Sequence, residues 1–275
     1  MSSLDEFYQK NRNQLESFYP GIQLRILKEH YERFCSLNKK EEIFFNGLIE
    51  GKPLEYILGK AFFYNIELDL SDCALIPRFE TEILLEKALA FITNSEKKNL
   101  KIADIGTGPG TILLALSKES RTPFEGIGVD IDKDCIELAK KNYMKLKPSF
   151  SAQIDLFFEV GDRLGNKKKK FDLIVSNPPY IKKRADREKV HSQVLKYEPA
   201  TALFLEDDSY EEWFSLFFKQ VHSCLCPDGL FLMEGHEDHL EKLIPFAKDQ
   251  GLELNELIND LTNKPRILSL GKQNG

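Results

Sequence analysis

Residues Lys101-Ile102-Ala103-Asp104-Ile105-Gly106-Thr107-Gly108-Pro109-Gly110 join a short apolar run to a loop that contains three glycines. The apolar run predicts a buried strand, and the residues from Thr111 onward have the pattern of a helix. Glycine adopts backbone conformations that other residues avoid, so a loop of this kind can pass close to a bound molecule before the helix begins. The stretch therefore predicts a strand, a binding loop and a helix, in that order.

The same alternation of strand and helix continues along the chain. Further strands are predicted at 126–130, 154–160, 171–176 and 229–234, and further helices from about Lys133 and over about 209–224. Strands and helices in alternation are typical of a parallel sheet that is covered by helices on both faces. We therefore expect an α/β fold of the Rossmann-like class.

The glycine loop and the next strand end predict a nucleoside cofactor. Asp130 ends the second strand roughly 20 residues after the loop, where a carboxylate can accept hydrogen bonds from both ribose hydroxyls. The spacing is G-x-G-x-G, because position 111, where the dinucleotide fingerprint has its third glycine, is Thr111. A plain structural turn is the alternative interpretation of the loop.

Together with an acidic residue at Asp104, this spacing resembles the class I methyltransferases, which bind S-adenosyl-L-methionine. In these enzymes the glycine loop packs against the amino-acid part of the cofactor. The adenine amine needs an acceptor, and Asp162 follows the third strand where methyltransferases usually flank that ring, although a turn aspartate is the simpler interpretation. The predicted cofactor-binding residues are Asp104, Gly106, Thr107, Gly108, Pro109, Gly110, Asp130, Asp162, Arg163 and Asn177.

The turn Asn177-Pro178-Pro179-Tyr180 follows the predicted strand 171–176 and is the candidate catalytic site. The Asn177 side-chain carbonyl and the Pro178 main-chain carbonyl would stand in a stiff turn that suits a planar NH2 group. Two acceptors would hold both N–H bonds of a poorly nucleophilic amide nitrogen and orient it toward a methyl group. The Tyr180 ring would offer a π face to the sulfonium of the cofactor and pack beside the substrate. A strand-ending turn without function is the alternative.

The N-terminal part of the chain has a different pattern. Apolar residues at helical spacing over the first 50 or so residues, with breaks at Pro20-Gly21 and near Gly51, predict a small helical domain. Alternating residues between Gly59 and Leu75 predict a short hairpin. We expect a helical domain at 1–58, a hairpin or linker at 59–76 and the catalytic domain at 77–275.

Composition excludes several classes of function. The chain has 275 residues, of which 42% are hydrophobic, so one large or two modest cores can form. A net charge of -6 argues against stable nucleic-acid binding by charge and favours a protein substrate. The sequence shows neither a signal peptide nor an apolar run that could span a membrane, and its five cysteines lack framework spacing, so we expect a cytoplasmic protein.

Two clusters of candidate metal ligands do not have the spacing of a metal site. Cys224 and Cys226 lack a second pair. The acidic and histidine residues from Glu234 to His239 match no zinc motif, and acids at the start of a helix explain them as well. We assign no metal.

Nearly the whole chain resembles the HemK/PrmC family of release factor glutamine N5-methyltransferases. Besides the glycine loop and the Asn177 turn, the resemblance rests on three stretches, at 51–59, 75–82 and 197–203. It implies a helical substrate-recognition domain and methylation of the glutamine in the Gly-Gly-Gln motif of peptide chain release factors. The glutamine would bind at 177–180.

The chain departs from the family pattern at Pro109 and at Glu234-Gly235-His236. Glutamine methylation of a ribosomal protein stays open as an alternative. Adenine amino-methylation of nucleic acid also stays open, because those enzymes have a similar pocket and flip a base into it. The oligomeric state does not follow from the sequence.

Overall fold

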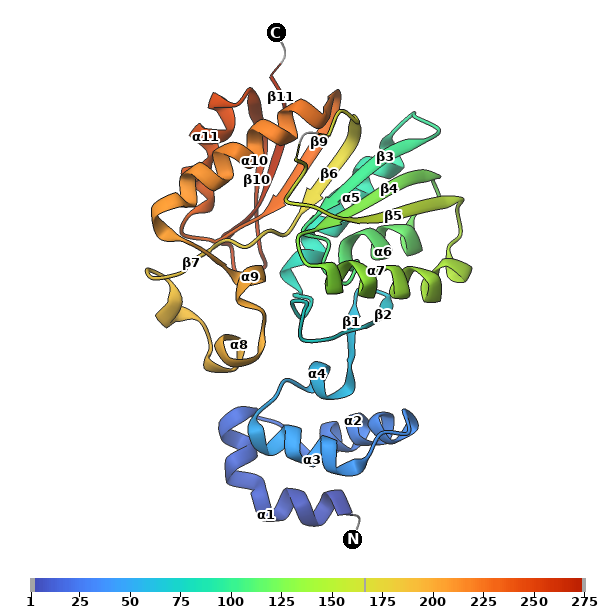
Figure 1. Cartoon of the computed structure of the whole chain (residues 1–275), viewed down its shortest axis with the longest axis vertical. Helices are drawn as coiled ribbons and strands as arrows, with labels where there is room; N and C mark the ends of the chain where they lie inside the picture. Colours follow the sequence, from blue (N-terminus) through green and yellow to red (C-terminus); the bar gives the residue numbers. More distant parts are fainter. Residues whose placement is uncertain (1–2, 166, 274–275) are drawn as a thin grey trace.

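Helices α1 to α4 form the N-terminal end of the computed structural model, which describes residues 3–165 and 167–273 (Figure 1). Their apolar stripes pack on one another around Leu27, Phe34 and Phe44, which are fully buried. Gly51 ends α3 with a φ of 73°, a conformation that favours glycine. The bounds are α1 Ser3–Phe18, α2 Leu24–Ser36, α3 Glu41–Glu50 and α4 Leu54–Leu58.

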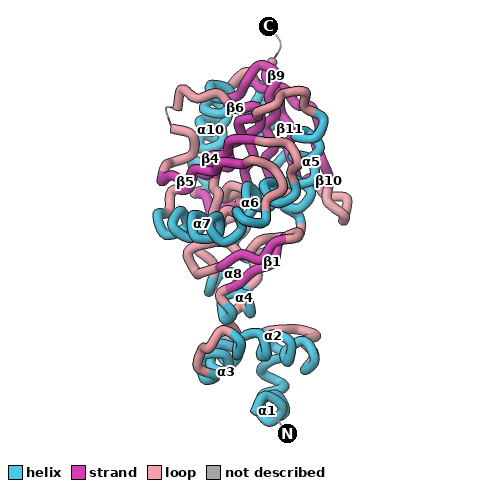
Figure 2. The backbone as a smooth tube through the Cα atoms, turned by 90° about the vertical axis from the view of Figure 1, so that its right-hand side faces the viewer, coloured by secondary structure: helices cyan, strands magenta, loops and turns pink. Residues whose placement is uncertain are grey.

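An antiparallel hairpin of β1 (Lys60–Phe63) and β2 (Ile66–Asp69) connects these helices to the rest of the chain. Figure 2 shows β1 between α4 and the helices α6 and α7. The Asn142 side chain of α7 accepts a hydrogen bond from the Asp69 N–H at 2.8 Å and donates to the Pro109 carbonyl at 2.9 Å. The hairpin is thereby fixed to the glycine loop.

A seven-stranded sheet forms the centre of the larger unit, in the order β10-β11-β9-β6-β3-β4-β5. The strands β3, β4, β5, β6 and β9 run parallel to one another, so their carboxyl ends meet at one edge. Crevices at this edge are where open α/β sheets bind ligands. The bounds are β3 Leu100–Ile105, β4 Phe124–Asp130, β5 Ile154–Val160, β6 Phe171–Ser176, β9 Leu225–Glu234, β10 Leu252–Asn259 and β11 Pro265–Lys272.

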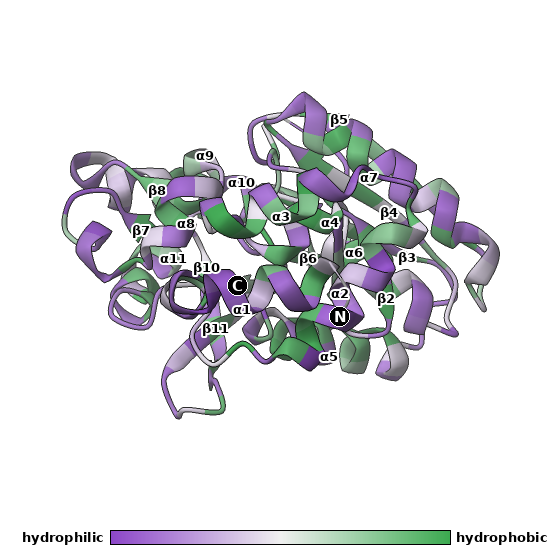
Figure 3. Ribbon diagram, turned by 90° about the horizontal axis from the view of Figure 1, so that it is seen from below, coloured by the Kyte–Doolittle hydropathy of each residue, from purple (hydrophilic) through white to green (hydrophobic). Residues whose placement is uncertain are grey.

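Helices cover both faces of the sheet, as the sequence predicts. One apolar core holds α5, α6 and α7 against one face, and a second core holds α10 and α11 against the other. Hydrophobic positions gather around the central strand β6, and the outlying loops are mostly hydrophilic (Figure 3). The bounds are α5 Glu80–Asn94, α6 Thr111–Glu119, α7 Lys133–Leu146, α10 Tyr210–Cys224 and α11 Ile244–Asp249.

A long connection between β6 and α10 carries only short elements. It contains β7 Ile181–Lys182 and β8 Phe204–Leu205, which pair in parallel, and the helices α8 Ser192–Tyr197 and α9 Ala200–Leu203. Single turns of 3-10 helix lie at Lys147–Ser149, Arg187–Lys189, Asp207–Ser209 and Leu240–Leu243. Among the described residues, no helix combines the length and the apolar character that a membrane span requires.

The predicted parallel sheet is confirmed for its central strands, but one edge of the sheet is antiparallel. The strand β11 runs antiparallel to both β9 and β10. A short turn over 260–264 joins β10 to β11, and so short a connection can only reverse the chain, whereas a parallel pair needs a crossover. The fold is thus a Rossmann-like α/β fold with a mixed sheet.

Candidate active site

A cavity of about 320 Å³ opens at the carboxyl edge of the parallel strands. Its volume lies in the range of small-molecule sites, roughly 300–1,000 Å³. The cavity brings together residues from four separate segments that the sequence marks as functional. These are Gly106, Thr107, Gly108, Pro109, Asp130, Asp162, Arg163, Asn177, Pro178 and Pro179.

Two predicted cofactor-binding residues, Asp104 and Gly110, do not line this cavity. Asp104 is fully buried and accepts a hydrogen bond from the Thr107 hydroxyl at 2.8 Å. Its Oδ1 is the buried side-chain atom without a hydrogen-bond partner in the described part of the chain, and burial raises the pKa of Asp104 to about 7. Gly110 caps α6 with a φ of 87°, and a Cβ there would lie 2.8 Å from Leu114. Asp104 therefore supports the loop from the end of β3, and Gly110 ends the loop at the start of α6.

The loop itself exposes bare backbone to the cavity. Gly106 and Gly108 have φ values of 71° and 55°, and the Gly106 N–H donates to the Val129 carbonyl at 2.8 Å. A Cβ on Gly108 would meet no other atom within 4 Å, so it would stand in open space. A ligand can therefore approach the Gly108 backbone closely, which is the fit that a small cofactor in this cavity requires.

Asp130 lies half-buried beside the loop with acceptor capacity to spare. Its Oδ2 accepts the Gly108 N–H at 2.8 Å and its Oδ1 accepts the Asp132 N–H at 2.9 Å. Each carboxylate oxygen can accept a second hydrogen bond, so the pair suits two neighbouring hydroxyls. Burial raises the pKa of Asp130.

Asp162 and Arg163 form an ion pair at the rim of the cavity. Arg163 donates from Nε and Nη2 to the Asp162 carboxylate at 2.9 Å and 2.7 Å. The guanidinium lies 4.8 Å from the centre of the Trp213 ring, and Nη1 donates to the Trp213 carbonyl at 3.2 Å. Trp213 also lines the cavity, and the sequence patterns did not predict it.

The Asn177 side chain is held at its amide nitrogen and open at its oxygen. Nδ2 donates to Thr81 Oγ1 at 3.1 Å, and no hydrogen bond from another described residue reaches Oδ1. The preceding Ser176 fixes the turn to the neighbouring strand, because its hydroxyl donates to the Ile105 carbonyl at 2.7 Å. The acceptor that the sequence predicts is thus available.

Tyr180 lines a second cavity, of about 270 Å³, and not the first. Its hydroxyl donates to Glu234 Oε1 at 3.0 Å, and its carbonyl accepts from the Tyr210 hydroxyl at 3.0 Å. The predicted contact of the Tyr180 ring with a sulfonium in the first cavity therefore lacks support from the geometry. Asn177, Arg78 and Ala202 line both cavities, so the two cavities meet at the turn.

Three further residues at this junction were not among the predicted site residues. Thr81, the second residue of α5, is buried, and its hydroxyl donates to Glu234 Oε2 at 2.6 Å. Glu234, at the end of β9, is fully buried, and burial raises its pKa. Arg78 forms a 2.6 Å ion pair with Glu198, whose side chain is 1% exposed. Membership of Arg78 and Thr81 in the stretch 75–82 was the signal that could have identified them.

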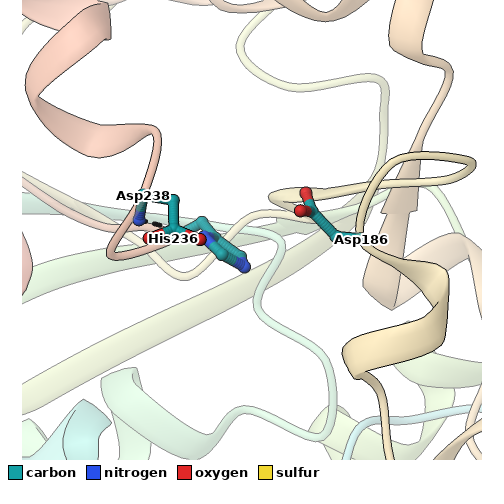
Figure 4. Close-up of side chains that lie close together, drawn as sticks. All are labelled: Asp186, His236 and Asp238. Carbon is teal, nitrogen blue, oxygen red and sulfur yellow. Dashed lines mark hydrogen bonds between the residues drawn. The ribbon is translucent and has the colours of Figure 1, made fainter.

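One group of possible metal ligands lies beside the second cavity. Ligand atoms of Asp186, His236 and Asp238 lie within 4.8 Å of one another, with Asp186 on a segment that faces the loop of the other two (Figure 4). Both carboxylates are ion-paired with Lys189, at 3.3 Å and 2.8 Å. His239 Nε2 also lies 2.7 Å from Asp186. The positive charge of Lys189 explains how the two carboxylates can lie close together.

Comparison with known proteins places the geometry in context. Residues 96–274 match the family described as a methyltransferase domain. The release factor glutamine methyltransferase of Haemophilus influenzae is 34% identical over 229 residues, which are 80% of this chain and 75% of that protein. The enzyme of the same name from Shewanella oneidensis is 32% identical over 97% of this chain and 85% of its own length.

A solved structure agrees on the fold. The crystal structure of a methyltransferase from Pyrococcus furiosus has a TM-score of 0.51 and 17% sequence identity, over 77% of this chain and 91% of that chain. At this identity the likeness supports the Rossmann-like methyltransferase fold alone.

Proposed function

The chain belongs to the family of release factor glutamine methyltransferases, and from this premise we propose that it methylates the glutamine of the Gly-Gly-Gln motif in a peptide chain release factor. The methyl donor would be S-adenosyl-L-methionine, and the product would carry the methyl group on the side-chain nitrogen. The acidic net charge of -6 agrees with a protein substrate better than with a nucleic acid.

The observation that carries the proposal is the position of Asn177. Its side chain lies where the two cavities meet, with its amide nitrogen tied to Thr81 and its oxygen open. A methyl donor in the first cavity and a methyl-accepting side chain in the second cavity would face each other at this point. An open amide oxygen there suits an N–H donor, as a glutamine side chain supplies.

The polar groups that line the first cavity suit the parts of S-adenosyl-L-methionine. Asp130 would bind the ribose hydroxyls, the backbone at Gly106 and Gly108 would pack against the amino-acid part, and Asp162 would flank the adenine. When bound, S-adenosyl-L-methionine would supply an electrophilic methyl group to the glutamine nitrogen. S-adenosyl-L-homocysteine would be the leaving group, and the nitrogen would release one N–H proton to solvent.

At the turn the chain contributes orientation. The Asn177 side-chain oxygen and the Pro178 carbonyl would accept the two N–H bonds of the glutamine amide. Holding both bonds in place aims the nitrogen at the methyl group, and well-oriented reactants can gain about 7–11 kcal/mol of the barrier. Tyr180, in the second cavity, would pack beside the entering side chain.

The helical unit at 1–58 would recognise the protein substrate. Val190 and Val194, at one side of the second cavity, belong to the segment that leads into and forms α8. From the same helix, Gln193 donates to the Gly51 carbonyl at 2.8 Å and Tyr197 to the Glu50 carbonyl at 2.5 Å. A protein that reaches into the second cavity would therefore also meet the helical unit. Release factors act on ribosomes, so this substrate would place the enzyme in the cytoplasm.

The test is transfer of labelled methyl groups from S-adenosyl-L-methionine by the purified protein. The acceptors are a release factor, its Gly-Gly-Gln to Gly-Gly-Ala variant, ribosomal proteins and adenine-containing oligonucleotides, assayed side by side. Label in the intact release factor and none in its variant is the expected result. Label in the oligonucleotides or the ribosomal proteins alone would overturn the proposal.

A further inference from the structure

A continuous chain of hydrogen bonds links the Asn177 amide to a buried carboxylate. Asn177 Nδ2 donates to Thr81 Oγ1 at 3.1 Å, and the Thr81 hydroxyl donates to Glu234 Oε2 at 2.6 Å. The other oxygen of Glu234 accepts the Tyr180 hydroxyl at 3.0 Å. The chain therefore connects the turn after β6, the start of α5 and the end of β9.

The chain has a fixed direction. Burial raises the pKa of Glu234, whereas the hydrogen bonds from Thr81 and Tyr180 favour its charged form, the carboxylate, which only accepts hydrogen bonds. A threonine hydroxyl has a single proton to donate. Because Thr81 gives that proton to Glu234, its oxygen can only accept from Asn177. Asn177 must then turn its NH2 group toward Thr81 and its oxygen away from it.

This direction matters because the two ends of an asparagine amide have nearly the same shape. Packing alone therefore does not determine which way the amide of Asn177 is oriented, whereas the hydrogen-bond network does. If Asn177 were reversed, its NH2 group would face the NH2 group of the glutamine. Two donors would then oppose each other, and one acceptor for the substrate would be lost.

We propose that Thr81 and Glu234 are positioning residues that keep the Asn177 side-chain oxygen facing the substrate amide. They act through Asn177 and do not touch the reacting atoms. The inference rests on the proposed function for its catalytic consequence, and on the hydrogen bonds alone for the orientation of Asn177. It also gives a role to Glu234, which lies where the chain departs from the family pattern.

The test uses the 275-residue protein and three variants of it. Thr81→Val keeps the shape of the side chain and removes the hydroxyl, and Thr81→Ser restores the hydroxyl. Ser117→Ala is a matched control, because Ser117 is also fully buried and its hydroxyl donates to the Leu113 carbonyl within α6. For each variant, kcat and KM on the release factor and Kd for S-adenosyl-L-methionine are measured.

Thr81→Val should lower kcat about 10- to 100-fold, since a misplacement of about 1 Å can reduce a rate by roughly that much. Its Kd for the cofactor should stay within about threefold of wild type, and Thr81→Ser should recover most of the lost kcat. Ser117→Ala should leave kcat unchanged. A wild-type kcat in Thr81→Val, or a loss of cofactor affinity as large as its loss of kcat, would overturn the inference.

A second readout needs no methyl acceptor, so it separates this inference from the proposed function. The side-chain NH2 resonances of Asn177 are assigned by NMR as those that disappear in Asn177→Ala. They should shift in Thr81→Val and return near their wild-type positions in Thr81→Ser. Unchanged resonances in Thr81→Val would overturn the positioning role, whereas a wild-type enzyme that does not methylate the release factor would overturn the proposed function alone.

Discussion

Replacing Asp104 by asparagine should change how the stability of the protein depends on pH. Asp104 is fully buried under the glycine loop, and its Oδ1 has no partner among the described residues. Burial raises its pKa from 3.8 to about 7, and the nearby Asp130 carboxylate acts in the same direction. The folded protein therefore holds a proton on Asp104 at pH values where the unfolded chain has lost it.

The sign and size of the effect follow from these two pKa values. The contribution of Asp104 to the free energy of unfolding is fully present below pH 3.8 and is lost as the pH rises to about 7. Each unit of difference in pKa corresponds to ~1.4 kcal/mol. Between about pH 5 and about pH 8, Asp104 should therefore lower the free energy of unfolding of the wild type by about 2 to 3 kcal/mol.

Asparagine does not titrate, so the Asp104→Asn variant should not lose this free energy of unfolding as the pH rises. The asparagine side-chain oxygen can still accept the hydrogen bond from Thr107. The assay is urea unfolding of both proteins at about pH 5 and about pH 8, where most other titrating groups cancel in the difference. The variant should gain about 2 to 3 kcal/mol relative to wild type over this range. A difference between the two proteins that is the same at both pH values would refute a buried, neutral Asp104.

The remaining predictions concern the turn, the cofactor cavity and the helical unit. Asn177→Ala should lower kcat on the order of 100-fold or more while Kd for S-adenosyl-L-methionine, measured by calorimetry, stays close to wild type; equal losses of both would mean that Asn177 is structural. Asp130→Ala should weaken cofactor binding by about 2 kcal/mol or more, because hydrogen bonds to a charged group are lost, and an unchanged Kd would remove its ribose assignment. Gly51→Ala should lower the melting temperature more than Gly21→Ala. Both glycines have positive φ, so the backbone strain is similar. A Cβ on Gly51 would lie 2.6 Å from the Phe18 ring, whereas a Cβ on Gly21 would meet no atom within 4 Å. Equal shifts in melting temperature would contradict this packing.

The central strands and the glycine loop could be predicted from the sequence because their signals are local. The strands predicted at 154–160 and 171–176 have the same bounds in the structure. Each is a short run with apolar residues that face the core: every second residue from Ile154 to Phe158 is buried in the first strand, and all residues are buried in the second. The edge strand β10 gave no such signal. Most of its side chains are exposed, as in Glu253 and Asn255, so its sequence lacks an apolar run.

The contacts that complete the site could not be predicted in this way. Asn177 and Thr81 are 96 residues apart, and the fold alone brings them within hydrogen-bond distance. Glu234 looked like part of an acidic cluster in the sequence, but the structure buries it beneath the turn. Sequence patterns identify the residues that follow the strands and lie at the site. The hydrogen-bond partners of those residues depend on tertiary packing.

The central claim is that the Asn177 turn directs a methyl group to one glutamine side chain. Mass spectrometry of a release factor after incubation with the enzyme and S-adenosyl-L-methionine tests it most directly. We expect one added methyl group, on the side-chain nitrogen of the glutamine in the Gly-Gly-Gln motif, and far less methylation over the same time with the Asn177→Ala variant. A methyl group at any other residue, or equal methylation by the Asn177→Ala variant, would contradict it.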